Sequence, residues 1–270
     1  MVPTYWWTTM TDFTQFKAIN SKLKKRFLLR KPNFSEASQQ FSDLSQDFKE
    51  FKLFAGYCSL ASARCEHSLG NVNMELQALL QAARHFAEGK EINAAISAYR
   101  HALLISAEAN LPYIYIELAR LYEKHRRFNE AAIVYEEASM FRDAANCFMD
   151  AHLYDKALSC FNKLDKQKLK VNDEISIFLL KLFLYDVRRL SLEFPVVNCT
   201  CEDDDIISLN ILLESLFYYE TEQREGVEIK NNIISKLNPF LDGRQKELLL
   251  ALADPRETDE LSYGMENWKI

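Results

Sequence analysis

The chain has 270 residues, enough for one large or two modest domains, and its 48% hydrophobic and 27% charged residues are ordinary for a globular protein. Only 6 glycines and 6 prolines occur, which disfavours turn-rich sheets and glycine-rich phosphate-binding loops and favours long helices. The net charge of −6 combines a balance of +4 over residues 1–190 with −10 over residues 191–270, a division that argues against nucleic-acid binding by the whole chain.

The sequence carries no signal for insertion into a membrane or for secretion. The longest apolar run, Ile175 to Tyr185, is interrupted by Lys181, so we expect no transmembrane helix. The first residues lack the basic and apolar regions of a signal peptide. We therefore expect a cytoplasmic protein whose six cysteines are reduced thiols.

The first predicted helix runs from Asp12 to Arg30, where apolar residues recur at the three- and four-residue steps of one helix face. Its C-terminal half and the residue after it are strongly basic, through Lys22, Lys24, Lys25, Arg26, Arg30 and Lys31. We interpret this basic segment as a contact for a protein partner, with an anionic membrane surface or a nuclear import signal as further interpretations. The alternative without a function is a capping helix whose long side chains keep the end of a helical stack in water.

Two further helices are predicted before the central repeats. Pro32 ends the first helix, and Asn33 followed by Glu36 predicts a capping box for a helix that reaches about Phe48. The next helix is predicted from about Leu53 to Leu69, ahead of a glycine and an asparagine suited to a left-handed turn.

The middle of the chain repeats the packing positions of a tetratricopeptide repeat, where small residues let two antiparallel helices approach and large residues fill the opposite hole. The first copy is Leu79, Ala82, Ala83, Phe86, Ala95, Tyr99 and Ala102, and the second is Tyr115, Leu118, Ala119, Tyr122, Ala131, Tyr135 and Ala138. The third copy, offset by only 26 residues, is Phe141, Ala144, Ala145, Phe148, Ala157, Phe161 and Leu164. Because one helix pair cannot bury its own apolar face, the copies predict an all-α, tetratricopeptide-like α-solenoid of stacked antiparallel helix pairs. An unrelated helical bundle is the alternative.

More helices are predicted after the repeats, and together they define the expected organisation of the chain. The predicted spans are Glu174–Leu190, Asp205–Tyr219, Gln223–Leu237 and Asp242–Ala253. The expected regions are an N-terminal arm (1–11), the helical repeats (12–190), an acidic linker (191–205), C-terminal helices of the same solenoid (206–253) and an acidic tail (254–270).

Two features of the C-terminal region predict contact with a partner. Phe217, Tyr218 and Tyr219 are adjacent, so one helix stripe cannot bury all three, and we expect at least one to face solvent or a partner. A cluster of glutamates follows at the next junction between helices: Glu220, Glu222, Glu225 and Glu228. Against a basic patch these carboxylates would speed docking, whereas in water they would add only solubility.

No motif of a catalytic, cofactor-binding or metal site occurs. The P-loop, the dinucleotide-binding fingerprint, the zinc-protease motif and the nucleophile elbow are all absent. The five histidines are too far apart in sequence to indicate a metal site, and Cys199 with Cys201 forms a single pair without a second one. We therefore expect a non-enzymatic interaction protein that needs no cofactor or metal.

Several stretches resemble the family of the 40-kDa huntingtin-associated protein, over roughly residues 15–255. They are SKLKKRFLLRKPNFSEASQQF, YCSLASARCEHSLGN, ALLQAARHF, AANCFMDAHLYDKALSCFNKL, ILLESLFYYETEQ and LNPFLDGRQKELLLALADP. The resemblance implies a non-enzymatic helical protein that is held between the helical-repeat arms of huntingtin and stabilises it. It also implies links to early endosomes, to their Rab-class small GTPase and to cytoskeletal motility. Vertebrate members of the family carry a long proline-rich insertion where this chain has only the Leu192–Asp205 linker, so functions of that insertion do not carry over.

A second interpretation is a vesicle-fusion adaptor resembling the soluble NSF attachment proteins. Those proteins share the stacked-helix build and an apolar loop near the front, where this chain has Trp6 and Trp7. The two interpretations predict different partners: huntingtin in one case, and an ATPase with SNARE proteins in the other. Neither predicts stable insertion into a membrane.

Overall fold

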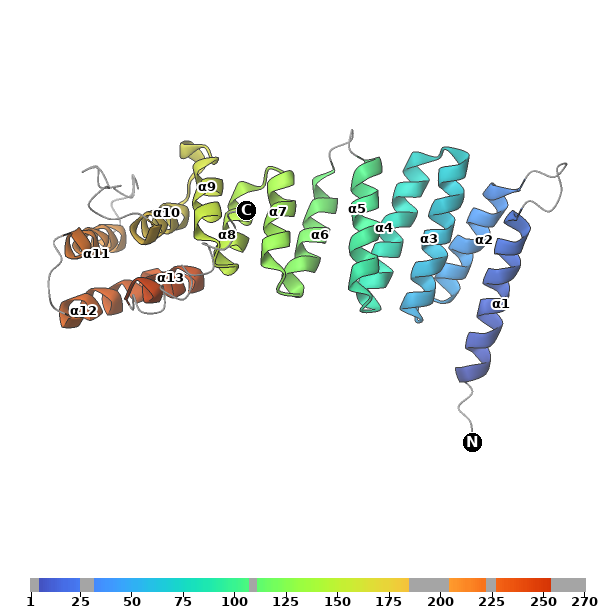
Figure 1. Cartoon of the computed structure of the whole chain (residues 1–270), viewed down its shortest axis with the longest axis horizontal. Helices are drawn as coiled ribbons and strands as arrows, with labels where there is room; N and C mark the ends of the chain where they lie inside the picture. Colours follow the sequence, from blue (N-terminus) through green and yellow to red (C-terminus); the bar gives the residue numbers. More distant parts are fainter. Residues whose placement is uncertain (1–4, 25–31, 107–110, 185–203, 222–226, 254–270) are drawn as a thin grey trace, which may run out of the picture. The chain divides into compact units, whose positions relative to one another are not determined.

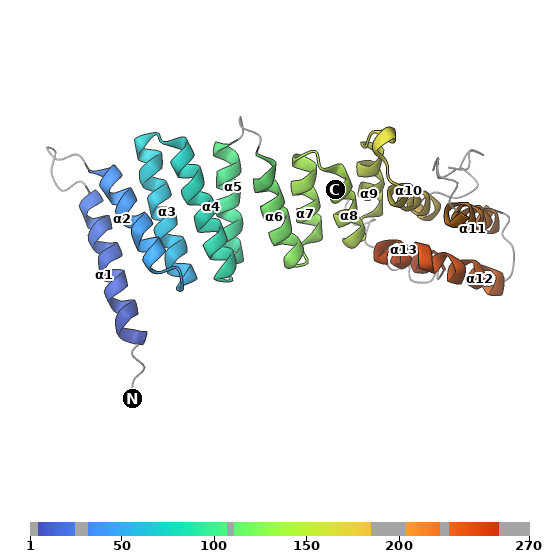
Figure 2. The same ribbon diagram turned by 180° about the vertical axis from the view of Figure 1, so that it is seen from behind.

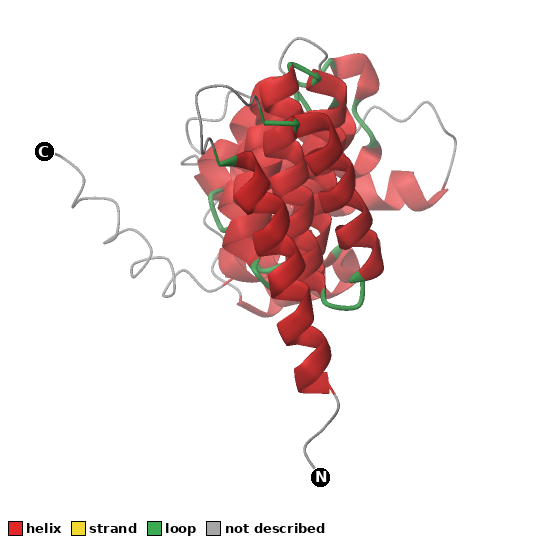
Figure 3. Ribbon diagram, turned by 90° about the vertical axis from the view of Figure 1, so that its right-hand side faces the viewer, coloured by secondary structure: helices red, strands yellow, loops and turns green. Residues whose placement is uncertain are grey.

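The computed structural model describes residues 5–24, 32–106, 111–184, 204–221 and 227–253 (Figure 1). Every regular element within these ranges is a helix, and none of the described residues forms a strand, as Figure 3 shows. The chain divides into two compact units, residues 1–125 and 126–270, and each unit is described by itself. The expected all-α fold of packed neighbouring helices is confirmed.

The first unit has six helices among its described residues, and each packs against the next one along the chain (Figures 1 and 2). They are α1 (Tyr5–Leu23), α2 (Phe34–Asp47), α3 (Lys52–Leu69), α4 (Val72–Glu88), α5 (Ile92–Ile105) and α6 (Pro112–Lys124). Helix α1 begins before the expected Asp12 and ends at Leu23, so the first predicted helix is confirmed over Asp12–Leu23. Residues 25–31 lie outside the described part of the chain.

The second unit begins with three short helices and continues with longer ones. Its helices are α7 (Phe128–Glu137), α8 (Phe141–Asp150), α9 (Tyr154–Asn162), α10 (Val171–Leu184), α11 (Asp204–Thr221), α12 (Val227–Leu237) and α13 (Gly243–Ala253), with 3-10 turns at Lys166–Lys168 and Asn238–Phe240. Helix α13 packs against both α10 and α8. The predicted linker lies almost entirely in residues 185–203, outside the described ranges.

The predicted capping box at the start of α2 is confirmed. The backbone N–H of Glu36 donates to Asn33 Oδ1 at 3.2 Å, and Asn33 Nδ2 donates to the Glu36 carboxylate at 3.1 Å. The side chain of Glu36 therefore reaches back to the capping residue, although it meets the amide side chain rather than the backbone N–H of Asn33. Two residues three positions apart thus fix where α2 begins.

The repeated positions form the core, as the tetratricopeptide pattern predicts. All seven positions of the first copy are buried, from Leu79 in α4 to Ala102 in α5. In the third copy the five positions buried are Ala144, Ala145, Phe148, Ala157 and Phe161. Both the alanines and the aromatic residues of the pattern are buried, as expected if small residues allow neighbouring helices to approach and large rings fill the core.

The third copy has a simpler explanation than a compressed two-helix repeat. Helices α7, α8 and α9 begin at Phe128, Phe141 and Tyr154, which are separated by 13 residues each. Each helix has an alanine three residues after its first aromatic residue and a second aromatic residue four positions later. The offset of 26 residues is therefore two steps of a repeat that contains one helix per step.

Five of the described turns between helices contain a left-handed residue at the same place. Gly70, Lys90, Arg126, Ser139 and His152 have φ between 55° and 75°, and each lies two positions before the first residue of the next helix. In the turns at positions 70, 90, 139 and 152, the N–H of the following residue donates to the carbonyl five residues earlier, at 2.8–3.0 Å, which is the Schellman motif. Four of the five residues carry side chains, although the left-handed region costs about 1–2 kcal/mol for them.

Two glycines of the first unit serve close packing rather than a turn. A Cβ atom on Gly56 would lie 2.8 Å from the ring of Phe86, and one on Gly89 would lie 2.8 Å from Leu53 Cδ2. Gly89 itself has φ of −77°, whereas the positive φ falls on Lys90. These glycines therefore let α3 and α4 approach each other.

A polar seam of serines joins α2 to α3. Ser45 Oγ lies 2.8 Å from Ser59 Oγ, and Ser38 Oγ lies 2.9 Å from Ser62 Oγ. Ser38 also donates a hydrogen bond to the carboxylate of Glu66. All five side chains are buried, and these hydrogen bonds help to satisfy their polar groups away from water.

Candidate interaction surfaces

A charged cluster in the first unit joins three successive helices. Arg84 of α4 donates two hydrogen bonds to the carboxylate of Glu117 in α6, at 2.7 and 3.0 Å. The hydroxyl of Tyr99 in α5 donates to the same carboxylate at 2.8 Å. Burial alone would raise the pKa of Glu117, but the hydrogen bonds from Arg84 and Tyr99 outweigh it and lower that pKa. The charged form of Glu117 is thus the form that holds these helices together.

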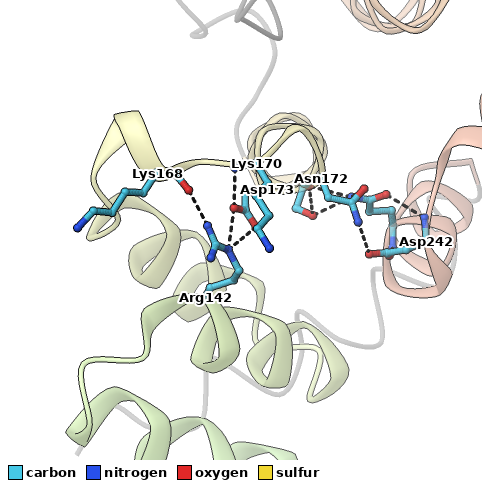
Figure 4. Close-up of polar contacts among 8 residues, drawn as sticks. Arg142, Lys168, Lys170, Asn172, Asp173 and Asp242 are labelled. Atoms are coloured by element: carbon cyan, nitrogen blue, oxygen red, sulfur yellow. Dashed lines mark hydrogen bonds and ion pairs between the residues drawn. The ribbon is translucent and has the colours of Figure 1, made fainter. Parts of the chain in front are cut away.

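A second polar cluster ties α13 to the helices before it in the second unit (Figure 4). Arg142 of α8 donates to the carboxylate of Asp173 in α10 at 2.8 Å. On the other side of α10, the fully buried Gln245 of α13 donates to the Asn172 carbonyl at 2.9 Å and to Ser176 Oγ at 3.0 Å. This network joins segments about 70 residues apart in the sequence.

In both clusters, side chains of different helices are joined by hydrogen bonds, so the polar groups have partners within the chain. Within the described ranges, no set of three histidine, cysteine, aspartate or glutamate side chains could hold a metal ion. The expectation that the chain is not an enzyme remains a prediction. Interaction surfaces are the sites that the described geometry does define.

The predicted basic segment lies mostly beyond the described residues. Lys22 lies in the last turn of α1 and Lys24 directly after it, and both side chains are exposed. The remaining members, Lys25, Arg26, Arg30 and Lys31, fall outside the described ranges. The structure therefore locates two members of the basic segment, both at the C-terminal end of α1.

A hollow of about 260 Å³ opens between α1, α2 and α3, and we name it the α1–α3 hollow. Its lining residues are Phe16, Asn20, Leu23, Phe34, Phe41, Ala61, Arg64, Cys65 and Ser68. Phe16, Leu23, Phe34 and Ala61 are only half-buried, although they pack against the core of these three helices. Sequence reasoning missed the hollow because its lining comes from three helices, and no single helix pattern contains it.

The three adjacent aromatic residues of α11 have different environments, as their spacing predicts. Phe217 is 9% exposed and belongs to the core, whereas Tyr218 is 51% exposed. Tyr219 is half-buried, and the ammonium of Lys230 in α12 lies 6.0 Å from the centre of its ring. Tyr218 is therefore the member of the trio that a partner can reach.

Tyr218 continues a row of exposed apolar side chains along α11, which we name the α11 stripe. Ile207 and Ile211 are 51% and 58% exposed, and with Tyr218 they follow the four- and seven-residue steps of one helix face. The side chains on the buried face of the same helix are Leu209, Leu213 and Leu216. The sequence analysis did not predict that Ile207 and Ile211 are exposed. The apolar residues on two faces of this helix could have indicated it, because only one of the faces can lie in the core.

The predicted acidic cluster cannot be located as a group. The side chains of Glu220 and Glu228, at the facing ends of α11 and α12, lie outside the described part, as do Glu222 and Glu225 entirely. Their contribution to a contact stays a prediction. None of the described helices is long and apolar enough to cross a membrane.

Comparison with known proteins supports the resemblance that the sequence suggested. The chain is 36% identical over 119 residues to the 40-kDa huntingtin-associated proteins of Rattus norvegicus and Mus musculus. The match covers 37% of this chain and 31% of each relative, so it spans about a third of their length. No family model matches the chain.

Proposed function

We propose that the chain is a non-enzymatic interaction protein that binds huntingtin as a stoichiometric partner and stabilises it. The similarity to two huntingtin-associated proteins carries this proposal. The early-endosome link, the Rab-class GTPase partner and a nuclear location are finer parts of the same proposal, and they rest on the resemblance alone. The main site of action proposed is the cytoplasm.

The α11 stripe supports a protein partner on physical grounds. Exposed apolar residues that line up on one helix face gain free energy when a partner removes them from water, at about 25 cal/mol per Å². Large side chains such as tyrosine and isoleucine provide much of that gain, and tyrosine is enriched among the residues that dominate binding energy. A helix face of this kind suits the helical-repeat surface of a large partner.

Co-purification of the full chain with full-length huntingtin tests the proposal. We expect one complex on a sizing column, with equal amounts of both chains, and we expect it to survive about 0.5 M salt because salt screens charges but not apolar contacts. Dissociation at that salt would mean that charged contacts dominate. Recovery of an ATPase with SNARE proteins in place of huntingtin would favour the vesicle-fusion adaptor.

The stability of the free chain gives a second measurement. A partner that binds only the folded state adds about 4 kcal/mol to its stability at a thousandfold excess over the dissociation constant. We therefore expect the chain to be degraded or to aggregate when it is produced without huntingtin. A soluble free chain that melts cooperatively at high temperature would contradict an obligate partnership.

A further inference from the structure

We propose that the α1–α3 hollow binds a bulky apolar side chain from an acidic segment of a protein partner. This inference deepens the proposed function, because it assigns the chemistry of one contact. It rests on the proposal that the chain acts by binding a protein. The hollow lies in the first unit, and the α11 stripe lies in the second.

The size and walls of the hollow fit an apolar side chain. Its volume of about 260 Å³ exceeds the roughly 150 Å³ of an engineered cavity that holds a benzene molecule. The side chains of Phe16, Leu23 and Phe34 are half-buried around it, while Phe41 closes its floor at 1% exposure. An aromatic or leucine side chain placed there would bury its own surface and that of three partly exposed residues.

The charged side chain that lines the hollow is basic. Arg64, which is exposed, lines it from α3, and the exposed Lys24 follows Leu23, which lines it from α1. Asn20 and Ser68 are its other polar walls, and none of the described lining residues is acidic. Carboxylates that flank an inserted apolar side chain would therefore meet positive charge, which steers encounter and fixes orientation.

Interfaces are built in this way when a central anchor fills a pocket and charges surround it. The competing occupants are the chain's own residues 27–29 and a second copy of the chain. The chain's own residues 24–31 include no aspartate or glutamate, so that segment offers no negative charge to Arg64. An acidic segment of a partner would place carboxylates beside Arg64, so the occupant that we propose is such a segment.

A photo-crosslinking residue, p-benzoylphenylalanine, at the exposed position 68 on the edge of the hollow identifies the occupant in the full chain, because a large residue there leaves the hollow open. The tagged chain is irradiated in cells that make huntingtin, and mass spectrometry maps the adduct. We expect the adduct on a protein segment in which a large apolar residue has aspartate or glutamate neighbours. An adduct on residues 27–29, on a second copy, or on a segment without acidic residues would overturn the proposal.

Two substitutions test the same contact quantitatively, with affinity for the crosslinked partner as the measurement. Ala61→Trp fills the hollow, and we expect it to weaken binding by about tenfold or more, as the loss of a buried anchor does. Arg64→Glu reverses the rim charge, and we expect a slower association at low salt that recovers at high salt. Arg120→Glu, an exposed reversal in α6, is the matched control and should leave binding unchanged.

Failure of folding and failure of the proposal give different results. Arg64 is exposed, so its replacement leaves the core intact, and thermal melting of Ala61→Trp against wild type reports whether that variant folds. Unchanged affinity in a folded Ala61→Trp variant would overturn the proposal. Absence of huntingtin from the purified complex would reject the proposed function, whereas an adduct on an acidic segment of another protein, weakened by Arg64→Glu, would still support the hollow.

Discussion

Helix α4 of the first unit and helix α11 of the second are both rich in apolar residues, but they use them differently. In α4 the buried side chains, such as Leu79 and Phe86, form one stripe. In α11 a buried stripe through Leu213 is accompanied by an exposed one through Ile211. In α4 the exposed large apolar side chains, Val72 and Met74, are confined to the first turn, whereas in α11 they line up along one face that the described part of the chain leaves exposed.

The largest expected effect is on folding, and it should appear only in α4. Phe86→Ala removes a ring that packs against Gly56, and we expect a loss of about 3–5 kcal/mol in the free energy of unfolding. Tyr218→Ala in α11 is the matched aromatic truncation, and we expect a loss of about 1 kcal/mol or less, because its ring is 51% exposed and lies in edge contact with Phe217. Urea denaturation followed by circular dichroism measures both. Equal losses would remove the distinction between the two helices.

The second effect should appear in binding, and only in α11. The double variant Ile207→Glu with Ile211→Glu places two charges on the α11 stripe, and we expect affinity for huntingtin to fall by about tenfold or more. The unfolding free energy should stay nearly constant, because both side chains are exposed.

Asn231→Glu serves as the control for that variant, since it adds a charge to an exposed position of α12. Co-purification of each variant with huntingtin, in competition with differently tagged wild-type chain made in the same cells, gives the relative affinities. Normal binding by the double variant would show that the α11 stripe stays in water.

The turn after α4 gives a smaller effect, in which two adjacent substitutions act in opposite directions. Lys90→Gly relieves a positive φ of 65°, and we expect it to stabilise the chain by about 0.5–1 kcal/mol. Gly89→Ala should destabilise it, because the added Cβ meets Leu53 Cδ2 at 2.8 Å and also the backbone carbonyl oxygen of His85 at 3.2 Å, which its hydrogen bond from the Gly89 N–H holds in place. Thermal melting of the two variants provides the comparison, and a stabilising Gly89→Ala would contradict the close approach of α3 and α4.

The smallest effect is a dependence of stability on pH that belongs to α4. Burial, helped by the charge of Lys52, lowers the pKa of His85, whose Nδ1 is buried without a hydrogen-bond partner. The unfolded chain takes up a proton at the ordinary histidine pKa of roughly 6.5, before the folded chain does, so stability falls as pH drops below that value.

The variant His85→Gln should make the stability of the chain depend less on pH between about 5 and 6.5. Denaturation series at several pH values, run on both proteins, measure this difference. Residues 204–253 contain no histidine, so α11 contributes nothing to the effect. Identical pH dependence in the two proteins would mean that His85 is protonated equally well in the folded state.

Local features of the fold could be predicted from the sequence, and features that depend on several helices could not. The capping box at Asn33 and the burial of Ala82 and Phe86 follow from spacing within one or two helices, so the pattern contained them. The turn after α4 could not be predicted in this way. Its glycine is at position 89, where a Cβ atom would lie 2.8 Å from Leu53 of another helix, whereas the positive φ falls on Lys90. The one-helix repeat of α7 to α9 was obscured because two steps of 13 residues imitate a shortened helix pair.

The candidate surfaces divide in the same way. The adjacency of Phe217, Tyr218 and Tyr219 predicts that one ring is exposed, because a helix turns by a fixed angle per residue. The α1–α3 hollow could not be predicted, since Phe16, Phe34 and Arg64 come together only when three helices have packed. A pattern within one segment therefore gives the identity of exposed residues, while the shape that they surround depends on tertiary packing.

The serine seam between α2 and α3 has a consequence for the uniqueness of the fold. An apolar seam of the same shape could slide by one helical turn at little cost, since leucine contacts leucine equally well in several alignments. The pairs Ser38–Ser62 and Ser45–Ser59 can form together in one alignment only, and a shift would break both pairs and remove the hydrogen bond from Ser38 to the Glu66 carboxylate. The serine seam thus favours a single alignment of the two helices. It contributes less to the free energy of folding than a well-packed apolar seam would, but it makes the alignment specific.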